Sequence, residues 1–322
     1  MKIAVIGGVS STRLLIAKLA QHDLRDVSVW GYEPDDHSLV SGWANLEAEA
    51  KLRGFLYEPF VRVADCLDSI RVFAPDIIFA VGLSQLIPDD ILQVSSLANI
   101  GFHPTALPKG RGRAAMAWMI LDNAPGAATF FLLNNGVDSG PILEQEIFSI
   151  DDTDDVSSIE HKILMAQSIA LDRLLPRIVL ADISAVQQDE AQATWYGRRA
   201  PEDGCIDWHA GAEDILRLVR ASAPPHPGAF TFHEDHRIQI LSARLCSRPE
   251  KGVVGRILQV AEDSAFVVQT GSGLIQVEQW QTDMSWQPRV GQRLGYYCQL
   301  EIYNIRKRLK AIERQLLILG SR

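Results

Sequence analysis

The chain opens with short apolar runs that alternate with segments of helical spacing. Residues 2–6 (KIAVI) form an apolar run after Lys2 that ends at Gly7-Gly8, and a helix that Ser10, Ser11 or Thr12 can cap is expected next. Strands are expected near 27–30, 55–57, 76–81 and 99–102, with helices through 46–52, around Ile70 and through 115–121. Repeated strand–helix units predict an α/β fold with a Rossmann-like, doubly wound, mostly parallel sheet. Two β-rich stretches, 127–133 and 142–150, and a helix from the carboxylates at 151–155 to Leu180 complete this part.

The pattern changes after residue 185. Residues 187–192 are polar, and short strand signals separated by turns dominate from 228 to 297. The expected strands lie at 229–232, 238–245, 253–259, 265–270 and 274–279. This predicts a smaller β-rich domain of the OB-like barrel kind. We expect an N-terminal catalytic domain over 1–195, the β-rich domain over 196–300 and a C-terminal helix over 301–322.

The last segment has the spacing of a coiled coil. Apolar residues follow one another at 3-4-3-4-3 intervals, at Ile302, Ile305, Leu309, Ile312, Leu316 and Leu319. Two interpretations carry equal weight. The helix packs on its own domain, or it forms the seam of a homodimer.

Charge and cysteine usage exclude several classes of protein. The chain has 31 Lys and Arg against 40 Asp and Glu, a net charge of −9, which disfavours nucleic acid and anionic membranes as partners. Its four cysteines form no C-x-x-C pair, so we expect no metal site. Because no apolar run approaches the length of a membrane helix or signal peptide, we expect a cytoplasmic protein.

The strand ends are where chemistry is expected, because ligands of doubly wound sheets collect at the carboxyl ends of the strands. The first loop, Gly7-Gly8, lacks the G-x-G-x-x-G pattern of dinucleotide-binding folds. After Phe102 comes a richer segment: residues 101–118 read GFHPTALPKGRGRAAMAW, and residues 136–140 read GVDSG. The segments after Val81 and Phe102 are therefore the candidate site.

These two segments resemble the signature of the folate-dependent formyltransferases, in which N-x-H-x-S-L-L-P-x-x-R-G is followed by a G-x-D-x-G loop. The segments RRAPEDGCIDW (198–208) and LVRASAPPHPGAF (218–230) resemble the linker and C-terminal domain of the same family. Within it, the G-F-H-P and R-G-R variant looks more like the amino-sugar N-formyltransferases of surface-polysaccharide and nonulosonic-acid pathways than like methionyl-tRNA formyltransferase. The resemblance implies 10-formyltetrahydrofolate as co-substrate.

Formyl transfer to an amine needs a group that stabilises a tetrahedral oxyanion and a group that takes a proton from the amine. His103 can do either, because an imidazole gains or loses a proton near neutral pH. Asp138 can orient or charge that imidazole and receive the proton. We therefore expect His103 and Asp138 to be the catalytic residues.

One position departs from the family pattern. The family's asparagine lies two residues before the histidine and helps to hold the formyl oxygen, but Gly101 stands there. Asn99 lies two residues too early, several ångströms away along a strand. Either Gly101 makes room for another donor, such as a backbone N–H or water, or the activity is altered.

The remaining site residues follow from the resemblance and from local charge. By resemblance, folate is expected beside Ser84, Gln85, Leu86 and Ile87 and along Gly136 and Val137; an ordinary helix entry before Pro88 is the other interpretation of 84–87. The basic cluster of Lys109, Arg111 and Arg113 fits the diphosphate of a nucleotide sugar. We expect substrate to be held by Gly101, Pro104, Thr105, Lys109, Arg111, Arg113 and Arg199. Trp195 and Tyr196 can stack on a base or pack two domains together.

The expected function is therefore formyl transfer from 10-formyltetrahydrofolate to the amine of a nucleotide-linked deoxy amino sugar, in a homodimer. Two alternatives stay open. One is formylation of methionyl-tRNA, which needs a basic surface. The other is a non-catalytic protein that binds folate or a sugar nucleotide and has lost the asparagine at Gly101.

Overall fold

The computed structural model describes residues 1–37, 40, 42–282 and 285–320. The chain divides into two compact units. The first comprises Met1–Ala200 with Ala221–His226, and the second comprises Pro201–Arg220 with Pro227–Arg322.

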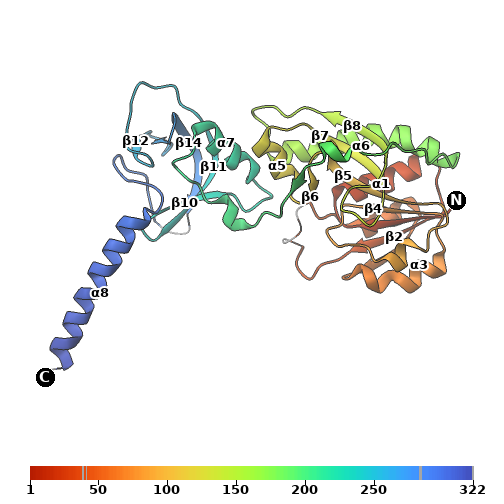
Figure 1. Cartoon of the computed structure of the whole chain (residues 1–322), viewed down its shortest axis with the longest axis horizontal. Helices are drawn as coiled ribbons and strands as arrows, with labels where there is room; N and C mark the ends of the chain where they lie inside the picture. The colour runs from red at the N-terminus through yellow and green to blue at the C-terminus, as the bar shows by residue number, and fades with distance from the viewer. Residues whose placement is uncertain (38–39, 41, 283–284, 321–322) are drawn as a thin grey trace. The chain divides into compact units, whose positions relative to one another are not determined.

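The first unit is built on a seven-stranded sheet (Figure 1). The strands are β1 (Ile3–Gly7), β2 (Val27–Tyr32), β3 (Leu56–Phe60), β4 (Ile77–Val81), β5 (Ala98–Thr105), β7 (Gly126–Leu132) and β8 (Ile142–Phe148). Their order is β3-β2-β1-β4-β5-β7-β8. The first five strands are parallel, whereas β7 and β8 are antiparallel to their neighbours. The predicted doubly wound, mostly parallel sheet is confirmed.

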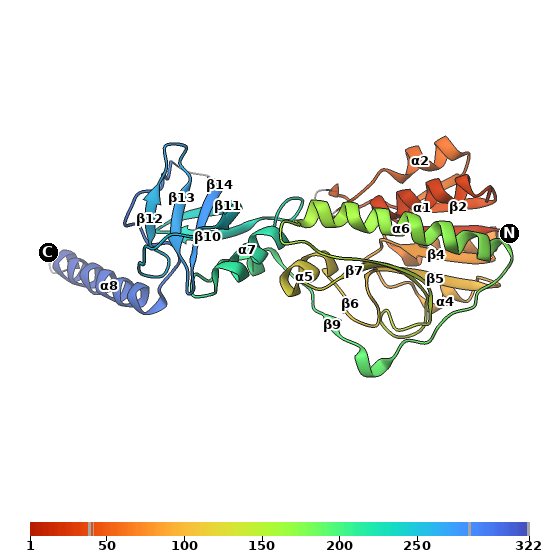
Figure 2. The same cartoon turned by 90° about the horizontal axis from the view of Figure 1, so that it is seen from above.

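Helices cover both faces of this sheet, as Figure 2 shows from above. They are α1 (Ser10–Gln21), α2 (Leu46–Arg53), α3 (Leu67–Phe73), α4 (Asp89–Leu92), α5 (Ala115–Asp122) and α6 (Val156–Val179). Alternate residues of β1 point to opposite faces. Ile3 and Val5 share a core with α1, α2 and α6, while Ala4 and Ile6 share one with α3 and α4. The near-continuous apolar pattern of β1 therefore reflects burial on both faces.

The predicted N-cap of α6 is confirmed, whereas that of α1 is wrong. Val9, not one of the three hydroxyl residues after it, is the N-cap of α1, and it makes no side-chain cap. Thr12 instead donates its hydroxyl hydrogen bond to the Val81 carbonyl, which joins α1 to the end of β4. Asp155 does cap α6, accepting from the Ser158 N–H.

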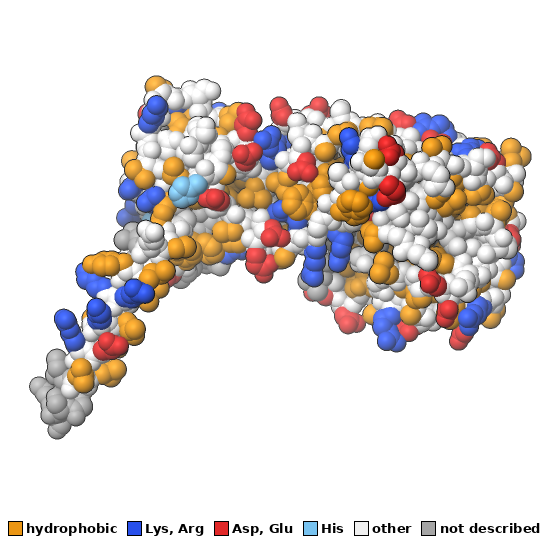
Figure 3. Space-filling model, in the orientation of Figure 1, with side chains coloured by type: hydrophobic (Ala, Val, Ile, Leu, Met, Phe, Trp, Pro, Cys, Tyr) orange, Lys and Arg blue, Asp and Glu red, His pale blue; other side chains and the backbone are white. Residues whose placement is uncertain are grey.

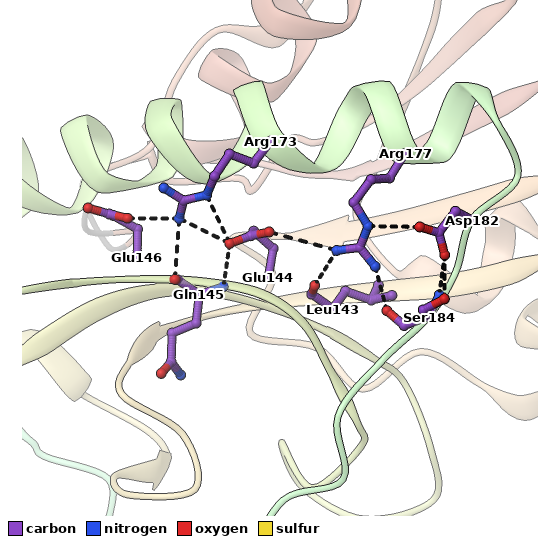
Figure 4. Close-up of polar contacts among 8 residues, drawn as sticks. All are labelled: Leu143, Glu144, Gln145, Glu146, Arg173, Arg177, Asp182 and Ser184. Carbon is purple, nitrogen blue, oxygen red and sulfur yellow. Dashed lines mark hydrogen bonds and ion pairs between the residues drawn. The ribbon is translucent and has the colours of Figure 1, made fainter.

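Ion pairs hold α6 against the outer strand β8 (Figure 4). Arg173 donates to Glu144 at 3.0 Å and to Glu146 at 2.7 Å. Arg177 donates to the Leu143 carbonyl and to Asp182, which follows the helix. The hydrogen bonds from Ser184 and Arg177 lower the pKa of the Asp182 carboxyl to about 2. These contacts fix the end of the sheet that follows the Asp138 loop.

The described residues of the second unit form a five-stranded antiparallel sheet, two α-helices and a short 3-10 helix. Its strands are β10 (Ala229–His233), β11 (His236–Leu245), β12 (Ile257–Val260), β13 (Phe266–Gln269) and β14 (Leu274–Thr282), in the order β10-β11-β14-β13-β12. The helix α7 (Ala212–Ala221) was not predicted, although it contributes Ile215 and Val219 to the core of this unit. The predicted strands all form, and the chain ends in α8 (Cys298–Gly320).

No helix in the described part of the chain combines the length and the apolar character that crossing a bilayer requires.

Candidate functional site

His103 lies at the carboxyl edge of the parallel sheet. Ala80 of β4 pairs with Gly101 of β5, and β4 ends one residue later. His103 therefore lies beyond the end of the neighbouring parallel strand, at the edge where ligands of such sheets usually bind. Its imidazole is buried, with 7% of the residue exposed.

Each ring nitrogen of His103 faces an acceptor. Nε2 lies 2.8 Å from the Gly110 carbonyl oxygen, and Nδ1 lies 3.5 Å from Oδ2 of Asp138. Because a carbonyl can only accept, Nε2 carries a proton in this arrangement. A second proton on Nδ1 then makes an imidazolium that faces the Asp138 carboxylate. The carboxylate is therefore placed to stabilise the positive charge of a protonated imidazole.

The Asp138 carboxylate is also held by the backbone. Its Oδ2 accepts a 2.8 Å hydrogen bond from the N–H of Gly112, and Asp138 itself has a positive φ of 50°. Gly112 has a φ of +106°, and a Cβ there would lie 2.5 Å from the Tyr196 carbonyl oxygen. The R-G pair of the motif thus presents a backbone donor that only a glycine can place here.

Gln188 joins the two motifs, although it was not among the predicted site residues. Its Nε2 donates to the carbonyls of Asp138 at 2.8 Å and Gly140 at 2.7 Å, and its Oε1 accepts from Arg111. The sequence shows only a polar stretch at this position. The Gln188 amide bonds to Gly140, 48 residues earlier, and to Arg111, 77 residues earlier, and contacts over such distances leave no local pattern in the sequence.

Arg111 has a different set of partners from the one expected. Its guanidinium forms a double hydrogen bond with Glu190, at 2.7 and 2.9 Å, and also donates to Gln188. The residue is 2% exposed. These bonds hold the 110-loop to the 188–190 segment, so the phosphate role predicted for Arg111 stays a prediction without a free guanidinium to support it.

The segment that follows residues 188–190 forms a small parallel sheet with the 110-loop. The strands are β6 (Arg111–Gly112) and β9 (Trp195–Tyr196). The Tyr196 ring stacks on Trp118 at 5.7 Å, and the Arg199 guanidinium lies 5.4 Å from the Trp118 ring. Burial, together with Asp122, raises the pKa of Tyr196 to about 12. Tyr196 therefore lies beside the 110-loop and Arg199 lies over Trp118, and the substrate contact predicted for Arg199 stays a prediction.

Lys109 and Arg113 are exposed at the two ends of the same loop. Neither side chain forms an ion pair with another of the described residues. Thr105 is buried and donates to the Lys109 carbonyl at 2.9 Å, so it shapes this loop. Pro104 lies at an irregularity in the β5–β7 pairing, between His103 and Thr105.

Gly101 is surrounded by apolar side chains. A Cβ at this position would lie 2.7 Å from both Leu133 Cδ2 and Phe131 Cζ. Phe131 is paired with Gly101 across β5 and β7 and is 2% exposed. The Phe131 ring and Leu133 therefore fill the space beside the glycine, and an asparagine would require them to move. Asn99 bonds elsewhere, to Ser95 and to the Leu92 carbonyl.

The residues expected to bind folate lie on two loops. Ser84 to Ile87 follow β4, whose carboxyl end is next to that of β5, and α4 begins only at Asp89. Gln85 bonds to the backbone of Val61 and Val63, whereas Leu86 is 87% exposed. On the other loop, Gly136 is exposed and Val137 is 54% exposed. Ser84, Leu86 and Val137 are thus available to a ligand.

Among the described residues, no group of three or more His, Cys, Asp or Glu side chains is arranged to hold a metal ion.

Solved structures show which known proteins share this architecture. An N-formyltransferase from Helicobacter canadensis, in complex with folinic acid and dTDP-3-aminofucose, matches with a TM-score of 0.68 and 16% identity, over 87% of this chain and 100% of its own. HypX from Aquifex aeolicus, in complex with tetrahydrofolic acid, matches with a TM-score of 0.61 and 18% identity, over 90% of this chain and 46% of its own. This chain thus spans about half the length of HypX. Methionyl-tRNA formyltransferase from Clostridium thermocellum matches with a TM-score of 0.53 and 18% identity, over 76% of this chain and 94% of its own.

Family models give the more specific result, because these identities establish a shared fold alone. The formyl transferase model matches residues 1–175, which include His103 and Asp138. The model of the formyl transferase C-terminal domain matches residues 199–286. With both domains matched in order along the chain, this protein belongs to the formyl transferase family of enzymes.

Proposed function

We propose that this enzyme transfers a formyl group from 10-formyltetrahydrofolate to the amine of a nucleotide-linked amino sugar. The observation that carries the proposal is the His103–Asp138 pair, held by the carbonyl of Gly110 and the N–H of Gly112 at the carboxyl edge of the sheet. This pair is built to accept a proton, which is what an attacking amine must lose.

In the proposed reaction the amine nitrogen forms a bond to the formyl carbon, and the bond from that carbon to N10 of the folate breaks. The proton lost by the amine passes to the His103–Asp138 pair. N10 of the folate, which is the leaving group, takes up one proton. The imidazolium that forms is stabilised by the carboxylate 3.5 Å away. The backbone donor at Gly112 holds the Asp138 carboxylate in place beside the imidazole.

Exposed basic and aromatic groups support a nucleotide-linked substrate. Lys109 and Arg113 are exposed on the catalytic loop of a chain with a net charge of −9, so they give a local attraction for a diphosphate. The Trp118–Tyr196 stack, with Arg199 over Trp118, offers a face for a base. We assign phosphate contacts to Lys109 and Arg113, and loop positioning to Arg111.

For the folate, we propose the 84–87 loop and Gly136-Val137. The first follows β4 at the carboxyl edge of the sheet, the second directly precedes Asp138, and Leu86 and Val137 present apolar side chains that a pterin ring can cover. The fold shared with structures that hold folinic acid and tetrahydrofolic acid supports this assignment.

The absence of an asparagine at position 101 has a kinetic consequence. Removal of one oxyanion donor lowers turnover by about 10²–10³ in other enzymes. We therefore expect a functional enzyme with low turnover, unless a backbone group or water supplies that hydrogen bond.

The test is an assay of the whole chain with 10-formyltetrahydrofolate and UDP-, dTDP- and CMP-linked amino sugars, read by mass. Formylated product that His103→Asn abolishes and that His161→Asn leaves unchanged supports the proposal, since His161 lies exposed on α6 and makes a matched control. Folate binding without any formyl transfer would establish a non-catalytic binding protein instead. Formylation of methionyl-tRNA alone would replace the sugar substrate with tRNA.

A further inference from the structure

The C-terminal helix α8 exposes an apolar stripe. Its six seam residues are between 49% and 67% exposed: Ile302, Ile305, Leu309, Ile312, Leu316 and Leu319. Figure 3 shows hydrophobic side chains along this helix, interspersed with basic ones. The first of the two interpretations from the sequence, a seam packed on its own domain, would bury these side chains. The exposures do not fit it.

The spacing of the stripe fits another helix. The 3-4-3-4-3 intervals place Ile302, Leu309 and Leu316 at heptad position a, and Ile305, Ile312 and Leu319 at position d. A repeat of 3.5 residues keeps one narrow stripe in contact with a partner helix that supercoils around it. A flat surface or a globular groove does not require this regularity.

The flanking charges identify the partner as a second copy of α8. The g positions are Glu301, Arg308 and Gln315, and the e positions include Arg306 and Glu313. In a parallel, in-register pair, each g residue faces the e residue five positions on in the other helix. Glu301 then faces Arg306 of the second copy, and Arg308 faces Glu313, so every charged g–e pair is complementary.

The antiparallel alternative has fewer complementary pairs. There, g faces g and e faces e, and full overlap of the stripe sets Arg306 near Glu313 and Arg308 near the neutral Gln315. Counting both copies, the parallel pair has four complementary contacts within α8, whereas the antiparallel pair has two. The charges of α8 therefore favour the parallel direction.

We propose that this protein self-associates through α8, which forms a parallel, in-register coiled coil with α8 of a second copy. The inference does not depend on the proposed reaction, because α8 lies outside the residues of the candidate site.

The first test is the mass of the whole chain by sedimentation equilibrium at micromolar concentrations. We expect at least two chains per particle, with Leu309→Asp shifting the protein to monomer and raising the dissociation constant more than 100-fold. Because Leu309 is 54% exposed, this substitution leaves the folding of a single chain intact, which circular dichroism checks. Leu at position a with Ile at position d, as at Leu309 and Ile312, favours coiled coils of more than two helices. A particle of three or four chains that Leu309→Asp converts to monomer therefore also supports self-association through α8.

Charge reversal tests the direction. Arg308→Glu sets a carboxylate against Glu313 of the other copy, and we expect the dissociation constant to rise roughly tenfold. Adding Glu313→Arg restores the complementary pair and the affinity. Lys307→Glu is the matched control, because it changes the net charge equally at position f, away from the seam. In an antiparallel pair, Arg308→Glu sets a carboxylate near the neutral Gln315 and leaves the affinity unchanged, and adding Glu313→Arg weakens association because it faces Arg306.

A disulfide gives an independent measure of the direction. Leu316→Cys, in a chain with Cys205, Cys246 and Cys298 replaced by Ser, places two a-position thiols together in the parallel pair, and oxidation should link the chains. In the antiparallel pair the two thiols lie roughly 16 Å apart along the axis, too far to join.

A protein that stays monomeric at tens of micromolar, or whose mass Leu309→Asp leaves unchanged, would overturn the proposal. Vesicles of anionic phospholipid and methionyl-tRNA are added to the same chain as probes. Binding of either by a monomer through α8 would assign the apolar, basic helix to that partner instead.

Discussion

Gly101→Ala should destabilise the first unit, even though it adds one methyl group. The new Cβ would lie 2.7 Å from Phe131 Cζ and from Leu133 Cδ2, whereas carbon atoms in contact lie about 3.5–4.0 Å apart. The overlap is therefore about 0.8–1.3 Å on two sides. Phe131 is 2% exposed and paired with Gly101 across the sheet, so it has little freedom to withdraw.

Overpacking of this kind costs about 1–3 kcal/mol of the free energy of unfolding. For a unit of this size, each kcal/mol lowers the thermal midpoint by about 2–4 °C. We expect Gly101→Ala to lower the midpoint by about 2–12 °C in thermal unfolding followed by circular dichroism. Gly101→Asn should lower it further.

Two further variants separate crowding from other effects. Gly197→Ala is the matched control, because no atom lies within 4 Å of the added Cβ, and its midpoint should stay near the wild-type value. Phe131→Leu provides space, so Gly101→Ala should cost less in that background than alone. Only in a background with a smaller residue at 131 do we expect Gly101→Asn to raise formyl transfer. A Gly101→Ala protein as stable as the wild type would show that Phe131 and Leu133 do not fill the position of the missing amide.

Three other predictions follow from buried groups. Arg111→Gln should lower the free energy of unfolding by about 1–3 kcal/mol, because it removes the charge-assisted hydrogen bonds of a buried guanidinium. Lys109 is exposed, so Lys109→Gln should change the free energy of unfolding by less than about 0.5 kcal/mol and raise the KM for the nucleotide substrate. Equal stability of the two variants in urea unfolding would contradict the loop-positioning role of Arg111. Burial raises the pKa of the Asp154 carboxyl, but hydrogen bonds from the Asp151 N–H, Lys162 and Ser158 outweigh burial, and the net pKa is lowered. The carboxylate therefore stabilises the fold above pH ~4, and this stabilisation is lost as the pH falls through the lower pKa of the folded state. Asp154→Asn should reduce the fall of the unfolding midpoint at acid pH, and an unchanged fall would refute the assignment. Burial raises the pKa of the Cys66 thiol to about 12, with Glu58 and Asp65 adding to the effect, so in the native protein at pH 8 a thiol reagent should modify exposed Cys205 and Cys298 and leave Cys66 unmodified until urea unfolds the chain.

The first unit was largely predictable because its signals are local. The β1 run is apolar without interruption because it is buried on both faces, and the carboxylates before α6 include its cap, Asp155. The spacing of His103 and Asp138 within two motifs also belongs to the sequence, and so does the heptad order of α8. Each of these depends on neighbours a few residues away.

Long-range contacts decided the rest. Helix α7 was not predicted, because its apolar residues become a core only against the second sheet. Arg111 looked like a phosphate ligand until Glu190, 79 residues on, was placed beside it. Phe131 fills the space at Gly101 only because β5 and β7 pair in one register, and Gln188 joins two loops only once both are folded. The identity of a side chain specifies what it can bind, but the register and packing of distant segments determine which partner is within reach.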